Sequence, residues 1–192
     1  MPLIVASVVP TQTQYWRTYL QTRVITLNDI PLVNLYPTLG IDRALALVGA
    51  WSEHQTSALV IDGGTAWTIT GVDADGQFIG GAIVPGLRVQ MRSLHQQTAA
   101  LPKILLEEGE PIARWQTNTP DSIRSGVWYS LLAGIESFVW DWLHQYPDSA
   151  IVFTGGDGKR LWGAMKEAIA SQWPHTKVFY DPQIIFKGMS QL

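Results

Sequence analysis

Residues 57–86 read SALVIDGGTAWTITGVDADGQFIGGAIVPG, and this stretch decides the fold. It holds three short apolar runs, rich in Val, Ile and Thr and bounded by Asp and Gly, at residues 58–61, 66–72 and 77–84. Runs of this length and composition are typical of β-strands. Asp75-Gly76, between the second and third runs, is a hairpin signal. The stretch therefore predicts three consecutive strands.

The turn between the first two runs, Asp62-Gly63-Gly64-Thr65, combines a carboxylate, two glycines and a hydroxyl. Glycines let backbone N–H groups approach an anion such as a phosphate closely, and Thr65 adds a hydroxyl donor. The Asp62 carboxylate would repel a phosphate unless a cation lay between them. The combination suggests a site for a nucleotide and a cation, although the same residue types also form plain hairpin turns.

The composition indicates a globular protein with an apolar core. The 192 residues are 46% hydrophobic and 15% charged, with a net charge of -3 and no cysteine. This charge disfavours nucleic acid as the main ligand, and the lack of cysteine excludes disulfides, zinc–thiolate sites and a cysteine nucleophile. The N-terminus lacks the basic region of a signal peptide, and no uncharged stretch approaches a membrane span. We therefore expect a cytoplasmic protein that does not bind membranes.

The rest of the chain alternates between strand and helix patterns. Before the central stretch, the pattern predicts strands at residues 3–8, 23–27 and 32–36, and helices at residues 11–21 and 42–51. After it, the pattern predicts helices at residues 87–97, 120–145 and 159–171, strands at 150–153 and 177–180, and a tail at 181–192 that packs back. The helix at 120–145 is apolar on more than one face, which predicts that it is covered on two sides. Residues 98–117 form an excursion without periodicity, and the acidic residues 107–110 are expected in a solvated loop.

The order of these elements predicts an α/β fold with two lobes. Residues 57–192 have the order β-β-β, helices, β, α, β, whereas residues 1–56 have the order β, α, β and a helix. The order of elements in residues 1–56 resembles only the later portion of the order in residues 57–192. We interpret residues 57–192 as a complete second lobe and residues 1–56 as a first lobe that is incomplete at its N-terminus.

Gly40-Ile41-Asp42-Arg43 places a carboxylate and a guanidinium side by side at a predicted helix N-terminus. Asp is a common N-cap residue, so Asp42 has a purely structural interpretation. Alternatively, Asp42 accepts a proton from a substrate hydroxyl while Arg43 binds an anionic substrate group bidentately. The helix N-terminus would keep such a base ionised.

Two further motifs have both a structural and a functional interpretation. Thr154-Gly155-Gly156-Asp157 follows a predicted strand, where it forms either a tight turn or a surface for a flat ring or a ribose. Asn118-Thr119 precedes the long helix and is either an N-cap or part of a site. The four histidines lack the spacing of zinc ligands, and neither a Gly-x-Ser-x-Gly elbow nor a Walker-type phosphate loop occurs.

Taken together, the motifs resemble a known family. ASVVP, LGIDR, VIDGGTAWTIT, GGAIVPGL with LHQQTAALP, NTPDSIRSG and FTGGDG follow one another along nearly the whole chain. In this order they are similar to the type III pantothenate kinases of the acetate and sugar kinase/Hsp70/actin superfamily. The resemblance implies two ribonuclease H-like lobes, with ATP and pantothenate between them. It also implies ATP-dependent phosphorylation of the primary hydroxyl of pantothenate, the first step of coenzyme A synthesis.

The resemblance implies roles for individual residues. Asp42 would be the general base, and the pantothenate contacts would be Tyr36, Gly40, Ile41, Asp42, Arg43 and Thr119. Asp62 would hold a monovalent cation such as K⁺ or NH₄⁺, and Mg²⁺ would accompany ATP. The ATP contacts would be Gly63, Gly64, Thr65, Gly155 and Gly156. The family also implies a homodimer with its active site near the subunit boundary, in agreement with the apolar faces of the helix at 120–145.

The sequence departs from the family at its start. Family members open with a strand and an Asp-x-Gly-Asn-Thr turn that binds ATP phosphates, and nothing similar occurs before Leu3. Either this chain is truncated or the protein has lost full ATP binding, and for the chain as given we expect weak or no kinase activity despite an intact substrate side. The alternatives are a non-catalytic regulatory or accessory homologue and a related kinase for a sugar or a short acid. Asp42, Arg43, Asp62 and Thr119 argue against the non-catalytic homologue, because a binding module needs no base.

Overall fold

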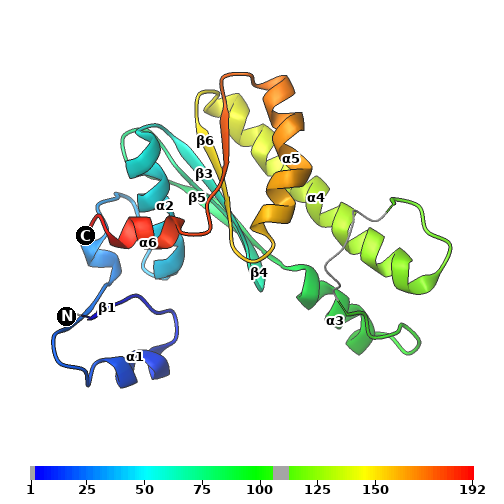
Figure 1. The fold of residues 1–192 in the computed structure, drawn as a ribbon, viewed down its shortest axis with the longest axis horizontal. Coiled ribbons are helices and arrows are strands. Elements are labelled where there is room, and N and C mark those ends of the chain that lie inside the picture. The colour runs from blue at the N-terminus through cyan, green and yellow to red at the C-terminus, as the bar shows by residue number, and fades with distance from the viewer. Residues whose placement is uncertain (1–2, 106–112) are drawn as a thin grey trace.

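A five-stranded mixed sheet forms the centre of the molecule (Figure 1). The computed structural model describes residues 3–105 and 113–192, so the predicted acidic loop at 107–110 lies outside the described residues. The strand order is β5-β4-β3-β6-β7, with bounds β3 Ala58–Gly63, β4 Ala66–Val72, β5 Phe78–Pro85, β6 Ala150–Thr154 and β7 Lys177–Tyr180. β3, β4 and β5 are antiparallel neighbours, and β6 and β7 continue the sheet in parallel with β3. The three predicted strands and the α/β class are confirmed.

Helices cover both faces of this sheet and create two apolar cores. The first core contains α4 (Thr119–Gln145) and α5 (Gly158–Gln172) packed on Leu59, Ile61, Trp67, Ile69, Ile151 and Phe153. The second contains α2 (Ile41–His54) and α6 (Ile184–Met189) packed on Ala58, Val60, Val72, Ala150 and Val152. Because β3 and β6 are buried on both faces, they are continuous apolar runs rather than alternating ones.

The C-terminal tail packs back on the rest of the chain, as predicted, because α6 crosses close to α2. Glycines allow this approach, because a Cβ on Gly49 would meet the carbonyl oxygen of Ile184, and one on Gly188 would meet that of Leu45. Lys187 adds ion pairs to Glu53 and Asp181, each 2.7 Å long. The tail therefore holds α2 in place.

The first part of the chain forms a separate, smaller sheet. β1 (Leu3–Val5) and β2 (Thr22–Val24) pair in parallel and are joined by α1 (Pro10–Trp16). The predicted helix at 11–21 is thus too long. It ends at Trp16 because the Thr18 and Thr22 hydroxyls bond to the last carbonyl groups, including those of Tyr15 and Trp16. The short 3₁₀-helix Leu27–Asp29 then leads toward α2.

The predicted strand at 32–36 is wrong. This segment makes a single bridge, between Val33 and Gln77. Asn34 has a φ of 62°, in the left-handed region that interrupts an extended strand, and its side chain donates to the Gln77 side chain at 2.8 Å. The apolar pattern here serves packing rather than a sheet ladder, since Leu32 lies buried in the second core.

α3 (Leu87–Gln97) and α4 extend beyond the end of the sheet (Figure 1). α4 buries a wide apolar set, Ile123, Val127, Trp128, Leu131, Ile135, Val139, Trp142 and Leu143. In the single chain its other apolar side is incompletely covered, since Phe138 is 45% exposed. Within the described ranges, no helix combines the length and apolar character needed to cross a membrane.

Candidate active site

The sheet face under α2 changes from apolar to polar toward the end of β3. Asp62 lies two residues after the buried Val60, so both side chains project from the same face. The register pairs Asp62 with Thr68 of β4 and Thr154 of β6, and it pairs Val60 with Thr70. Cross-strand partners share a face. One acidic and three hydroxyl side chains therefore gather at this end of the sheet.

The N-terminus of α2 lies on the same face. Gly40 is the N-cap residue, and Ile41 is buried as the first residue of the helix. Asp42 is therefore not the N-cap, although its carboxylate accepts a hydrogen bond from the backbone N–H of Arg43 at 2.8 Å. Gly40 leaves room for this carboxylate, because a Cβ there would lie 2.5 Å from Oδ1 of Asp42.

Asp42 and Asp62 are close enough to interact electrostatically. Burial raises the pKa of the Asp62 carboxyl above its ordinary value, and the negative charge of Asp42 raises it further. The half-buried Asp62 carboxylate, beside a second negative charge, is disfavoured in its ionised form unless a positive charge compensates. The pair therefore combines residues 20 positions apart in sequence into one acidic site.

Arg43 extends from α2 across the sheet. It is only 8% exposed, and its Nε donates to the Thr70 hydroxyl oxygen at 3.1 Å. Its Nη1 donates to the Tyr36 hydroxyl at 2.9 Å, while the Tyr36 ring packs edge-on against Phe78, with 5.6 Å between ring centroids. The structure thus groups Tyr36, Gly40, Asp42 and Arg43 of the predicted substrate contacts.

The two predicted glycine turns are neighbours, because β3 and β6 are adjacent parallel strands. The Asp157 backbone N–H donates to the Gly63 carbonyl at 2.8 Å and ties the turns together. Gly155 has a φ of 81°, and a Cβ on it would meet the Asp62 carboxylate. Gly156 and Thr65 are exposed at the outer side of these turns, and Gly64 is half-buried between them.

Some residues of the site were missed by sequence reasoning. The fully buried Trp67 donates from Nε1 to the Asp157 carboxylate at 3.2 Å, a link between β4 and the start of α5. Thr68 and Thr70 were also missed. Counting alternate residues from Asp62 through the antiparallel hairpin would have indicated the two threonines, because the short turn determines the register.

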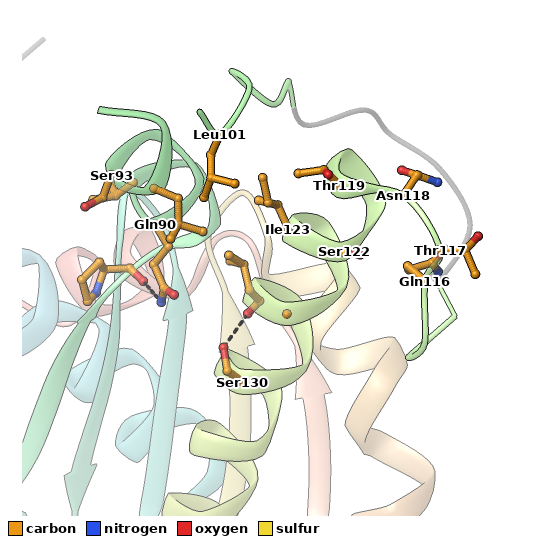
Figure 2. A pocket seen from close by; sticks show the side chains of 15 residues that line it. Gln90, Ser93, Leu101, Gln116, Thr117, Asn118, Thr119, Ser122, Ile123 and Ser130 are labelled. Atoms are coloured by element: carbon orange, nitrogen blue, oxygen red, sulfur yellow. Dashed lines mark hydrogen bonds between the residues drawn. The ribbon is translucent and has the colours of Figure 1, made fainter. Parts of the chain in front are cut away.

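Thr119 lies elsewhere, in a cavity of about 1030 Å³ between α3 and α4 (Figure 2). Its polar lining includes Gln90 and Ser93 of α3 and Ser122 of α4, but neither Asp42 nor Asp62. Asn118 is the N-cap of α4 and accepts the backbone N–H of Asp121 at 2.9 Å, which confirms the cap interpretation of this motif. α4 and α2 cover opposite faces of the sheet, so one chain does not bring Thr119 to the acidic pair.

Comparison with known proteins shows that the chain is related to phosphotransferases. Residues 2–141 match the sequence profile described as type III pantothenate kinase. A type III pantothenate kinase from Synechocystis sp. is 47% identical and covers 100% of this chain and 73% of its own length. Another from Nostoc sp. is 44% identical, with 100% and 69% covered. The chain belongs to the type III pantothenate kinase family, which confirms the resemblance of its motifs.

A solved structure supports the fold. The chain is similar to the crystal structure of a conserved Baf family transcriptional activator from Campylobacter jejuni, with a TM-score of 0.68 and 22% identity. The similarity covers 100% of this chain and 81% of that one. At this identity, the similarity describes the arrangement of the chain and not its activity.

Proposed function

We propose that this protein phosphorylates the primary hydroxyl of pantothenate with ATP and forms 4'-phosphopantothenate, the first step of coenzyme A biosynthesis. The observation that carries the proposal is the acidic pair, in which Asp42 at the N-terminus of α2 interacts with Asp62 on β3. Asp42 would accept the proton of the attacking alcohol. Asp62 would bind the cation that compensates the negative charge of the nucleotide. Phosphoryl transfer needs this combination of positioning and charge compensation more than it needs covalent chemistry.

Asp42 is the proposed general base. Its carboxylate lies in the first turn of α2, close to the positive end of the helix dipole. The carboxylate accepts the proton of the pantothenate hydroxyl as that oxygen attacks the terminal phosphate. General-base catalysis of this kind contributes about 10²–10⁴-fold to a rate.

Arg43, Tyr36, Gly40 and Ile41 form the proposed pantothenate contacts beside the base. Arg43 is buried and its side-chain hydrogen bonds go to the neutral hydroxyls of Thr70 and Tyr36. Among the described residues no carboxylate is bonded to this guanidinium, which suits it to the carboxylate of a ligand. The substrate carboxylate on Arg43 would hold the rest of pantothenate within reach of Asp42.

Asp62 is the proposed ligand of a monovalent cation such as K⁺ or NH₄⁺. The chemistry of the site fits such an ion, because a half-buried carboxylate lies beside a second negative charge. Within residues 3–105 and 113–192, no cluster of three His, Asp or Glu forms a cage for a more highly charged metal. Mg²⁺ bound to ATP would supply the remaining charge compensation on the phosphates. The proposed ATP contacts are Gly63, Gly64, Thr65, Gly155 and Gly156.

The position of Thr119 is the reason to propose a homodimer. It lines the cavity between α3 and α4, away from the acidic pair of its own chain. On the α4 side of the sheet, Phe138 is 45% and Ile79 44% exposed, and both line one cavity, which leaves apolar surface for a second copy. We propose that Thr119 of one copy contacts pantothenate held on Asp42 and Arg43 of the other.

We also propose two ribonuclease H-like lobes, residues 1–56 and 57–192, with ATP and pantothenate between them.

Calorimetric titration with pantothenate tests the proposal first, since it detects substrate binding without turnover. We expect binding of pantothenate and no binding of sugars. ATP-dependent phosphorylation is then measured in K⁺, NH₄⁺ and Na⁺. An Asp42→Asn variant should retain pantothenate binding and lose about 10²–10⁴-fold of any wild-type rate. A chain that binds sugars instead would be a different kinase, and one that binds neither ligand would refute the proposal.

A further inference from the structure

Thr70 is a buried polar residue that contacts the guanidinium of Arg43. It is 2% exposed, in the middle of β4, and its hydroxyl oxygen accepts the hydrogen bond from Arg43 Nε at 3.1 Å. Its two neighbours across the sheet are Val60 of β3 and Gly81 of β5. The apolar neighbours of a buried hydroxyl offer it no partner, so the Arg43 bond is the contact that compensates its burial.

Gly81 opens the space for the guanidinium on this face. A Cβ on Gly81 would lie 2.6 Å from Nη2 of Arg43, which is much closer than van der Waals contact allows. The guanidinium therefore lies directly against the backbone of β5, beside Thr70. A side chain at position 81 would remove the slot that β4 and β5 form for Arg43.

Two hydrogen bonds define the plane of the guanidinium within this slot. Thr70 occupies Nε, and the Tyr36 hydroxyl accepts one N–H of Nη1. A carboxylate binds Arg bidentately along the Nε–Nη2 edge or the Nη1–Nη2 edge. Because Thr70 uses the hydrogen of Nε, the end-on edge formed by Nη1 and Nη2 is the one that remains for a ligand.

We propose that Thr70 is a positioning residue that makes the site selective for a carboxylate ligand by orienting Arg43. This inference rests on the proposed function, in which Arg43 binds the carboxylate of pantothenate. Without the Thr70 bond the guanidinium rotates and loses its bidentate geometry. Binding then weakens for the carboxylate ligand but not for an uncharged ligand of similar shape.

Calorimetry with pantothenate and with pantothenol tests this selectivity, since pantothenol has an alcohol in place of the carboxylate. In a Thr70→Val variant we expect the Kd for pantothenate to rise about ten- to a hundredfold, as for the loss of one hydrogen bond to a charged group. The Kd for pantothenol should change less than about threefold. Thr70→Ser keeps the hydroxyl and should restore pantothenate binding. Thr176→Val, which removes another buried hydroxyl bonded to the Pro147 carbonyl, is the control and should leave both constants unchanged.

Equal weakening for both ligands, or no weakening for pantothenate, would overturn the inference. A second measurement tests it in the free full-length chain. The NMR signal of the Arg43 Nε–H should be protected from exchange in wild type and Thr70→Ser, and unprotected in Thr70→Val. If wild type binds neither ligand, the proposed function fails while the NMR result still decides whether Thr70 holds Arg43. An unprotected signal in wild type would overturn the positioning role.

Discussion

Gly155 is a position where a single added methyl group should disturb both the fold and the candidate active site. Its φ of 81° is a conformation that residues with a Cβ adopt at a cost. A Cβ there would also lie 2.9 Å from the Gly63 backbone N and C atoms and would meet the Asp62 carboxylate. Gly155→Ala should therefore destabilise the fold and displace a residue of the active site. Gly156→Ala is the matched control, since its Cβ would have the Gly63 carbonyl oxygen as nearest neighbour, at 4.0 Å.

The magnitude follows from three contributions. The positive φ costs about 1–2 kcal/mol for a non-glycine residue. Relief of the overlap with Gly63 costs about 1–3 kcal/mol, as in other overpacked sites. Alanine also restricts the unfolded chain, and this effect offsets about 0.4–1 kcal/mol of the lost stability. The net loss for Gly155→Ala is about 1–5 kcal/mol, which lowers the Tm of a chain of this size by about 2–20 °C.

Thermal unfolding of the two variants and wild type, followed by circular dichroism, measures the difference. Gly156→Ala should stay within about 2 °C of wild type, because an exposed substitution without a clash changes stability by about 0.5 kcal/mol at most. Gly155→Ala would displace Asp62, the proposed cation ligand, so any phosphorylation by this variant, assayed below its Tm, should lose its dependence on K⁺. A Gly155→Ala protein that melts within about 2 °C of wild type would refute the steric and conformational argument.

Two more substitutions test the electrostatics and the packing. Because burial and Asp42 raise the pKa of Asp62, its protonated form is favoured by folding, and this stabilisation is lost as the pH rises through the folded pKa. Asp62→Asn should therefore raise the Tm at pH 7 in Na⁺ buffer, with a smaller gain at acidic pH; a lower Tm at pH 7 would contradict this. Gly188→Ala forces α6 away from the Leu45 carbonyl and should cost about 1–3 kcal/mol in urea unfolding. Gly163→Ala, in open space on α5, is its control, and equal stability of the two variants would exclude the close crossing.

The central strands could be predicted because their signals are local. The runs of Val, Ile and Thr in residues 57–86 and the Asp-Gly turn specify strands and a hairpin without reference to distant residues. The segment at 32–36 has a similar apolar pattern, yet it forms a single bridge. Its conformation depends on Asn34, whose side chain bonds to Gln77 across more than 40 positions of sequence. No local pattern contains that partner.

The motifs of the site were visible in the sequence, but their mutual contacts were not. Gly40–Arg43 and Asp62–Thr65 stand out as motifs because each places a carboxylate next to glycine and to a second polar side chain within four residues. The bond from Arg43 to Thr70 depends on the crossing of α2 over β4. The substrate role of Thr119 is a prediction from the family motif alone, and the single chain keeps this residue in the cavity between α3 and α4.

The sequence by itself therefore determined the strands of the central sheet, the helices that cover it, the two glycine turns and the family of the protein. These follow from hydrophobic periodicity and from residue types that occur within a few positions of one another. The tertiary structure decided that Asp42 and Asp62 interact, that Arg43 is oriented by Thr70 beside Gly81, and that Gly155 must lack a side chain. These contacts join segments 20 or more residues apart, and they depend on sheet register and on the packing of α2 against the sheet.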